Sequence, residues 1–434
     1  MNEEFLKRMQ EYLQDDYDKY LLALNKPKIR GLRINNNYLQ EEDFLSMVDF
    51  NVKPIVGLEN AFFIQDDLKF GFHPLHHAGA FYIQDPSAML PVLAYKKIAD
   101  IHLILDLCAS PGGKTLELAT IYQDAIIISN EIDFKRAQVL YSNVERFGLK
   151  NVIVTNNRPE DFLKSFTSCF DLILLDAPCS GEGMIRKLDE DLKWSQDYVN
   201  KCHLLDLSLI NVANQLLKKD GHLLYSTCTF SKEEDEMIVT KLIHDYQYEI
   251  IDMQEDLKKY VSPGFTDNTY RIYPFNEFGE GQFFSMLRKK DGSSFLPKRN
   301  VKRSDNNIFK SFCKENLDII IDNIKIVNDV IYYDNLLDLN GLRVLNYGVK
   351  LGSIEKNIFK PNHYFFKVFY KHFINQINLD FKDKNVNKYL HGEQINHPCL
   401  DGYGVLLVNN IPLGGFKAKN GVINNLYPKG LRNF

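Results

Sequence analysis

The chain has 434 residues, of which 45% are hydrophobic and 25% are charged. These proportions are typical of globular proteins and exclude disordered and fibrous classes. No apolar run approaches the roughly 18 residues of a membrane-spanning helix, and the N-terminal stretch lacks the layout of a signal peptide. We therefore expect a cytoplasmic protein, and the length predicts roughly two to four domains.

The net charge of −5 is unevenly distributed. Residues 288–434 contain 23 Lys and Arg against 13 Asp and Glu, an excess of +10 beside a remainder at −15. A basic C-terminal third is typical of a region that contacts a polyanion, although the same charge also suits a merely soluble surface. The seven cysteines include no CxxC pair, which indicates free thiols in a reducing compartment and no structural zinc.

Residues 1–80 have a mixed α/β pattern, which predicts an N-terminal domain. The pattern places helices over 3–24 and 41–48, and strands over 28–36 and 52–58. Three histidines follow, His73, His76 and His77. Because no cysteine or carboxylate stands at the offsets of a metal site, we expect structural or substrate-contacting roles for them and no metal.

An apolar strand, a glycine turn and a helix follow one another at 103–122, LILDLCASPGGKTLELATIY. Such a unit lets the main chain approach a nucleotide and points a helix N-terminus towards it. The turn is not a Walker A loop, because Cys108 stands where that motif requires glycine, and no GxGxxG fingerprint is present. We therefore expect a nucleoside cofactor without a pyrophosphate. Asp106 ends the strand, either to contact the ligand or to cap the following helix.

Strands and helices then alternate. The strand at 125–133 contains Glu131, 25 residues after Asp106, near where a doubly wound fold places a carboxylate on a ribose. A third strand covers 151–156. The order β-α-β-α-β-β-α-β predicts a parallel Rossmann-like sheet with helices on both faces.

Two further strands each lead to a cysteine. LILLDAPC finishes at Cys179 and HLLYSTC at Cys228, with a predicted helix over 197–218 that ends at Gly221 between them. A right-handed crossover puts both strands in one parallel sheet. Both thiols and Asp176 should therefore lie at the carboxyl edge, where open α/β sheets bind their ligands.

After the second cysteine, Ser231 and Glu234 form a capping-box pattern that predicts the start of a helix. The segments 269–275 and 281–289 predict an antiparallel hairpin that completes the sheet. The central domain is therefore expected over 81–289.

Residues 290–305 are polar, basic and without periodicity, which predicts a linker. Residues 306–434 resume a globular pattern and end in short strands and glycine turns, which predict a small β-rich module. Arg186 and Lys187 lie either on a loop over the site or on a solvated face.

The residues at the sheet edge favour a methyl transfer. A nucleoside cofactor without a pyrophosphate fits S-adenosylmethionine. C5 of cytosine or uracil is a poor nucleophile, but addition of a cysteine thiolate to C6 activates it. A second acid or base is then useful when the adduct collapses. The base must also be unstacked, which favours RNA loops or flipped nucleotides as substrates.

Three stretches, DLCASPGGKT, LLDAPCSGEG and YSTCTFSKEEDE, resemble the motifs of the Sun-type RNA cytosine-5 methyltransferases, and the layout is similar to their RsmF-type rRNA members. The resemblance implies a Rossmann-like class I methyltransferase sheet, an α/β N-terminal RNA-binding domain and a C-terminal RNA-binding region with a PUA-like module. It also implies small-subunit rRNA as the substrate and a monomer. A tRNA substrate and a non-catalytic ribosome-assembly factor are the alternatives, and a thiol oxidoreductase is disfavoured by the missing CxxC.

The resemblance also implies roles for single residues. Cys228 would attack cytosine C6, and Cys179 would assist collapse of the adduct. Asp176 would contact the cytosine and the cofactor region, and Lys114 would lie near the methionine end. The cofactor pocket would comprise Cys108, Ala109, Ser110, Pro111, Gly112, Gly113, Lys114, Glu131, Asn157 and Asp176. Asn156 and Asn157 stand where the family usually has a third cofactor acid.

Spacing alone does not decide which cysteine attacks. In DNA cytosine-5 methyltransferases the PC cysteine does so, whereas the additional TC cysteine of this sequence favours Cys228. The remaining cysteines, Cys108 among them, are expected to pack as small apolar side chains.

Overall fold

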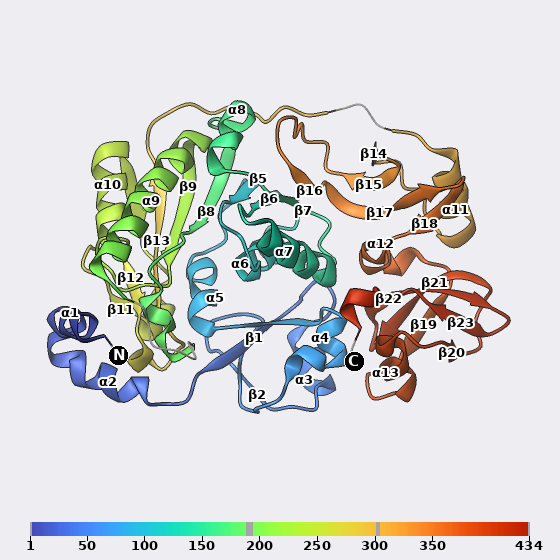
Figure 1. The fold of residues 1–434 in the computed structure, drawn as a ribbon, viewed down its shortest axis with the longest axis horizontal. Coiled ribbons are helices and arrows are strands. Elements are labelled where there is room, and N and C mark those ends of the chain that lie inside the picture. Colours follow the sequence, from blue (N-terminus) through green and yellow to red (C-terminus); the bar gives the residue numbers. More distant parts are fainter. Residues whose placement is uncertain (1, 188–193, 301–303, 433–434) are drawn as a thin grey trace.

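The computed structural model describes residues 2–187, 194–300 and 304–432. In Figure 1 a large sheet extends from the left of the molecule to its centre, the N-terminal part lies along the bottom, and the C-terminal region lies on the right. Among the described residues, none of the helices combines the length and apolarity that crossing a membrane requires.

The N-terminal part surrounds a four-stranded antiparallel sheet with the order β2-β3-β1-β4. Its elements are α1 (Glu3–Leu13), α2 (Tyr17–Leu24), β1 (Arg30–Ile34), α3 (Glu41–Met47), β2 (Val52–Pro54), β3 (Ala61–Ile64), α4 (Pro74–His77) and β4 (Phe81–Gln84). The expected helix over 3–24 is two helices, because a 3₁₀ turn that starts with Gln14 at positive φ separates them. The sheet reaches Gln84, since β4 pairs with β1.

The central sheet has the order β11-β12-β13-β9-β8-β5-β6-β7-β16, with β10 beside β13. Its parallel strands are β5 (Leu103–Asp106), β6 (Ile126–Asn130), β7 (Val152–Thr155), β8 (Phe170–Asp176) and β9 (Leu217–Thr227). Antiparallel partners are β10 (Tyr248–Ile251), β11 (Ser262–Pro263), β12 (Tyr270–Ile272) and β13 (Gln282–Lys289). The predicted Rossmann-like alternation and closing hairpin are confirmed.

The parallel strands are buried on both faces because their side chains alternate between two apolar cores. On β5, Ile104 packs into one core, whereas Leu103 and Leu105 pack into the other. Helices α5 (Pro86–Leu93), α6 (Gly113–Ile121) and α7 (Phe134–Phe147) cover the first face, and α8 (Leu163–Phe166), α9 (Gln196–Leu216) and α10 (Glu236–Tyr246) cover the second. The polar side chains at the strand ends are therefore held by a densely packed scaffold.

Two local predictions within this domain are wrong. Helix α9 runs directly into β9, and Gly221 lies inside the strand instead of ending the helix. The capping box of Ser231 and Glu234 is not formed, because α10 begins after Asp235 and the Glu234 carboxylate binds Ser180.

The C-terminal region contains two small sheets with the orders β14-β15-β17-β18 and β19-β21-β22-β23-β20. Its elements are α11 (Asn307–Asn316), β14 (Ile324–Val327), β15 (Val330–Asp334), β17 (Gly348–Glu355), β18 (Ile358–Pro361), α12 (His363–Val368), β19 (Gln376–Leu379), α13 (Lys384–His391), β20 (Ile395–Asn396), β21 (Gly402–Val408), β22 (Ile411–Lys419) and β23 (Val422–Asn425). One further strand, β16 (Val344–Asn346), pairs antiparallel with β7 at the edge of the central sheet. The sequence did not predict this shared strand.

The segment expected to be a linker, 290–305, lies against the central domain. The Ser293 carbonyl accepts a hydrogen bond from Lys219 N–H at 2.9 Å, and Phe295 N–H donates to the Ser168 carbonyl at 2.8 Å. Residues 301–303 of the segment lie outside the described residues. The described part is thus a strap attached by main-chain hydrogen bonds.

A buried ion pair joins the N-terminal sheet to the central domain. Arg33 on β1 lies 3.1 Å from Glu117 on α6, measured from Nε to Oε1, and the two side chains are 3% and 0% exposed. Burial raises the pKa of Glu117 to about 7, and the neighbouring guanidinium opposes this shift. The carboxylate therefore depends on Arg33 for its charge compensation.

We expect Arg33→Ala to lower the free energy of unfolding by about 3–5 kcal/mol, because it leaves a buried carboxylate without its cation. Arg30→Ala is the matched control on the same strand, since Arg30 pairs with the fully exposed Asp67 and should matter much less. Denaturant titration of both variants measures the difference. Equal losses would show that the buried pair has no special role.

Candidate active site

Two thiols meet at the carboxyl edge of the central sheet. Cys179 follows β8 by three residues and Cys228 follows β9 directly, and these two strands are parallel neighbours. Their Sγ atoms lie 3.1 Å apart, and Cys228 N–H donates to the Cys179 sulfur at 3.3 Å. The structure therefore brings the two cysteines to one point, as the strand order predicts.

The two thiols differ in their affinity for a proton. The hydrogen bond from Cys179 lowers the pKa of Cys228, with help from Lys114 and against burial and Asp176. The same hydrogen bond, together with burial, raises the pKa of Cys179 well above its ordinary value. Of the two thiols, Cys228 therefore loses its proton more readily than Cys179.

An ion pair stands beside the sulfur atoms. Lys114, in the first turn of α6, places its Nζ 2.8 Å from Oδ2 of Asp176, at the end of β8. The other oxygen of Asp176 accepts a hydrogen bond from Ser226 Oγ at 2.6 Å. Burial alone would lower the pKa of Lys114, but the carboxylate outweighs burial and raises it. The lysine is thus held as a cation next to Cys228.

The glycine turn between β5 and α6 is fixed by its neighbours. Gly112 has a φ of 111°, which favours glycine, and a Cβ on Gly113 would lie 3.1 Å from Tyr82. Ser110 Oγ donates to the carbonyl of Arg136 at 2.9 Å, and the carbonyl of Pro111 accepts from Asn143. The turn therefore keeps its main chain close to the sheet edge.

Two other residues of this turn, Cys108 and Ala109, are held by the surrounding protein. Burial raises the pKa of the Cys108 thiol, in keeping with the expected packing role. The Ala109 N–H donates to the Asn130 carbonyl at 2.8 Å.

Asp106 accepts from the hydroxyl of Thr115 at 2.6 Å and not from the helix main chain, so the capping interpretation is wrong. Burial raises the pKa of Asp106 to about 7, and its Oδ1 atom is buried without a hydrogen-bond partner.

The two expected cofactor contacts at the far end of the edge have different surroundings. Glu131, which follows β6, is 3% exposed, and its carboxylate accepts from Asp133 N–H at 3.0 Å. Asn157 is bound instead to the C-terminal region: its Oδ1 accepts from Arg343 N–H at 2.8 Å, and its amide donates to the Arg343 carbonyl at 3.1 Å. The side chain of Asn157 is thus bound to the main chain of Arg343, and its role as an adenine contact stays a prediction.

The loop after Cys179 is anchored by two basic residues. Arg186 is buried, and its guanidinium lies 2.7 Å from Glu280. It also donates a hydrogen bond to the carbonyl of Gly279. The alternative that Arg186 lies on a solvated face is therefore wrong. Lys187 forms an ion pair with Asp85, at the start of α5. Both cations thus attach the cysteine loop to its surroundings.

Sequence reasoning missed several polar residues beside the site. They are Ser180, Ser226, Thr229 and Arg343, while Glu234 was assigned to a helix cap. The hydroxyl groups that directly follow the two cysteines, CS and CT, were the available signal for two of them. His73, His76 and His77 are not part of a metal cluster, since the described residues contain no group of three potential ligands.

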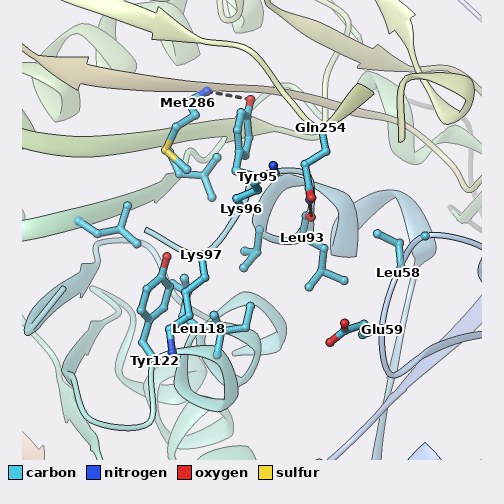
Figure 2. A pocket seen from close by; sticks show the side chains of 15 residues that line it. Leu58, Glu59, Leu93, Tyr95, Lys96, Lys97, Leu118, Tyr122, Gln254 and Met286 are labelled. Carbon is cyan, nitrogen blue, oxygen red and sulfur yellow. Dashed lines mark hydrogen bonds between the residues drawn. The ribbon is translucent and has the colours of Figure 1, made fainter. Parts of the chain in front are cut away.

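A cavity of about 350 Å³ lies elsewhere, between the N-terminal part and one face of the central sheet. Figure 2 shows that Leu58, Tyr95, Leu118, Tyr122 and Met286 surround it. Neither cysteine is among its lining residues, so it is distinct from the thiol site.

A doubly wound sheet with a glycine turn after its first parallel strand, and thiols after two neighbouring strands, defines a Rossmann-like methyltransferase with a cysteine pair. Three family models match the chain. They are 16S rRNA methyltransferase RsmB/F over residues 94–288, the N-terminal domain of 16S rRNA methyltransferase RsmF over 1–86, and the methyltransferase RsmF PUA domain over 376–433. The chain belongs to the RsmF-like, Sun-type methyltransferase family.

Individual proteins agree with this membership. A relative from Erwinia tasmaniensis, Ribosomal RNA small subunit methyltransferase F, is 32% identical over 312 residues, which cover 69% of this chain and 65% of that protein. A relative of the same name from Vibrio vulnificus is 29% identical over 390 residues, 83% of this chain and 82% of that protein. A solved methyltransferase homolog from Pyrococcus horikoshii has 25% identity and a TM-score of 0.58, over 67% of this chain and 95% of its own.

We expect iodoacetamide to alkylate Cys228 with a rate that rises at lower pH than for an ordinary thiol, because the pKa of Cys228 is lowered. Cys179→Ala removes the hydrogen bond that stabilises the thiolate, so it should move the pH–rate profile of Cys228 to higher pH. Mass spectrometry of the alkylated peptides measures both rates, with Cys399 as an internal reference, since burial raises its pKa. An unchanged profile in the variant would disprove the thiol–thiolate arrangement.

Proposed function

We propose that the protein methylates C5 of a cytosine in small-subunit rRNA, with S-adenosylmethionine as the methyl donor and Cys228 as the nucleophile. The observation that carries the proposal is the contact of the two sulfur atoms at 3.1 Å, and the lowered pKa of Cys228 favours this thiol as the nucleophile. The names of the two curated relatives support small-subunit rRNA as the substrate.

The proposed mechanism begins when the Cys228 thiolate adds to C6 and makes C5 nucleophilic. S-adenosylmethionine, when bound, supplies the electrophilic methyl group. C5 then loses its proton to a base, the C6–S bond breaks, and its electron pair returns to the sulfur of Cys228. The Cys179 thiol, 3.1 Å from that sulfur, is placed to stabilise the departing thiolate by its S–H hydrogen bond.

Asp176 favours cytosine over uracil in this proposal. Its carboxylate, paired with Lys114, accepts hydrogen bonds and donates none. The exocyclic amine of cytosine is a donor, whereas the corresponding oxygen of uracil is an acceptor. Asp176 is 35% exposed and can therefore still receive a donor from the substrate.

The residues present fit the cofactor. The Asp106 carboxylate is buried behind the glycine turn with one oxygen unpartnered, and a Cβ on Gly113 would be in tight contact with the side chains of Tyr82 and Gln84. The main chain of residues 108–113 would hold the cofactor with Glu131 on the ribose, and Lys114 and Asp176 would stand at the methionine end. We also propose RNA-binding roles for 1–80 and 306–434, which the matches to RsmF N-terminal and PUA models support.

The strand order indicates where the adenine end belongs. The reactive methyl end must be near the cysteines after β8 and β9, whereas Glu131 follows β6 on the other side of β5. The base would therefore lie towards β7, where the guanidinium of Arg343 is 4.8 Å from the ring centroid of Phe134. We propose that Arg343 and Phe134 line the adenine end of the cofactor pocket.

We expect wild-type protein to transfer labelled methyl groups to small-subunit rRNA, and bisulfite sequencing to map them to cytosine. Cys228→Ala should abolish this transfer, because it removes the nucleophile. Cys179→Ala should instead accumulate a covalent protein–RNA adduct, visible as a shifted band on a denaturing gel. Intact activity in Cys228→Ala, or free turnover without an adduct in Cys179→Ala, would contradict these roles.

We expect Arg343→Ala to raise the Kd for S-adenosylmethionine roughly 2- to 5-fold, because it removes a stacked cation from the pocket wall. Arg288→Ala is the matched control, since Arg288 pairs with Asp220 and Glu249 at the opposite end of the strands. Isothermal titration calorimetry measures both affinities. Equal affinities for S-adenosylmethionine in the two variants would show that Arg343 does not contribute to the cofactor pocket.

A further inference from the structure

The carboxylate of Glu234 ties together the two loops that carry the cysteines. Its Oε2 accepts from Ser180 N–H at 2.8 Å, and its Oε1 accepts from Ser180 Oγ at 2.6 Å. The same Ser180 hydroxyl lies 2.7 Å from Oγ1 of Thr229. Ser180 directly follows Cys179 and Thr229 directly follows Cys228, so this chain of hydrogen bonds connects the residues next to both sulfur atoms.

These three side chains are isolated from solvent. Glu234 and Thr229 are 0% exposed and Ser180 is 7% exposed. Burial raises the pKa of Glu234 to about 7, and the two hydrogen bonds from Ser180 oppose this shift. Burial of the Glu234 carboxylate costs desolvation energy. The hydrogen bonds that both of its oxygen atoms accept from Ser180 offset this cost only while the two loops keep this geometry.

The local sequence predicts a different use of this residue. A glutamate three residues after a serine normally turns back to cap its own helix. Here the carbonyl of Ser231 accepts from the N–H groups of Glu234 and Asp235, and the hydroxyl of Tyr225 donates to the Glu234 carbonyl. The turn thereby directs the carboxylate towards Ser180 and away from α10.

We propose that Glu234 is a positioning residue that sets the distance between the two sulfur atoms, an inference that rests on the methyl transfer proposed above. Its carboxylate forms no hydrogen bond with either sulfur among the described contacts and acts through Ser180 and Thr229. If the two loops separate, Cys179 no longer donates to Cys228, and both the thiolate and its assisted departure are lost. Apart from Asp176 and Cys228, the contacts proposed for RNA and S-adenosylmethionine lie on other elements, so we expect binding of both to change little.

The experiment compares Glu234→Ala, Glu234→Gln and Ser180→Ala with wild-type protein. We expect kcat for rRNA methylation to fall roughly 10- to 100-fold in Glu234→Ala, the effect of losing a charge-assisted buried hydrogen bond, with KM for RNA within about twofold. The pH–rate profile for alkylation of Cys228 should move to higher pH in the same variant, because the hydrogen bond with Cys179 is the largest cause of the lowered pKa and outweighs the smaller opposing effect of the Glu234 charge. Glu234→Gln should recover part of the loss, because its amide oxygen still accepts from Ser180.

Glu233→Gln is the matched control. Glu233 precedes Glu234, but its partly buried carboxylate binds Arg8 and Gln196 and not Ser180, so its variant should keep the wild-type kcat and alkylation profile. Ser180→Ala removes only one hydroxyl group and therefore tests the proposal even if Glu234→Ala does not fold. A thermal shift with S-adenosylmethionine checks that each variant is folded.

Two results would overturn the proposal. One is a wild-type kcat and alkylation profile in both folded Glu234→Ala and folded Ser180→Ala. The other is a loss confined to KM for RNA. If wild-type protein transfers no methyl group, the proposed function fails, but the alkylation profile of Cys228 still decides whether Glu234 positions the two sulfur atoms.

Discussion

The hydrogen bond between two sulfur atoms depends on the register of two parallel strands. In the pairing of β8 with β9, Asp176 stands opposite Ser226, and each cysteine follows within three residues. A slip of one residue would move one loop by about 3.3 Å along the strand and turn its side chains to the other face. A contact of 3.1 Å does not survive such a shift. The two apolar cores that fix the register therefore also fix the site.

Helix α6 connects this site to the N-terminal part. Lys114 and Glu117 lie three residues apart and hence on the same side of the helix. Lys114 reaches Asp176 beside the thiols, and Glu117 reaches Arg33 on the N-terminal sheet. Since both pairs are largely buried, the N-terminal sheet is held in a fixed relation to the cysteine pair. A domain that presents RNA to the site needs such a connection.

The sequence predicted those features that depend on local patterns and on the rules of parallel sheets. Apolar runs ending in Cys179 and Cys228 were sufficient to place both thiols at one edge. Some of the failures involve partners that are distant in the sequence. The carboxylate of Glu234 binds Ser180, so a tertiary contact overrode the local capping pattern. Strand β16 escaped prediction for the same reason.

The choice between the two cysteines is the clearest case in which the spacing of the sequence motifs was not sufficient. Both follow buried strands and both are half-buried, so their positions in the fold are similar. They differ in pKa: the hydrogen bond with Cys179, and to a lesser degree the charge of Lys114, lower the pKa of Cys228. Asp176 in turn is the main group that raises the pKa of Lys114 against its burial. The difference in pKa between the two cysteines therefore depends on the contact between the sulfur atoms and on the charges of Lys114 and Asp176, which the assembled sheet edge brings together.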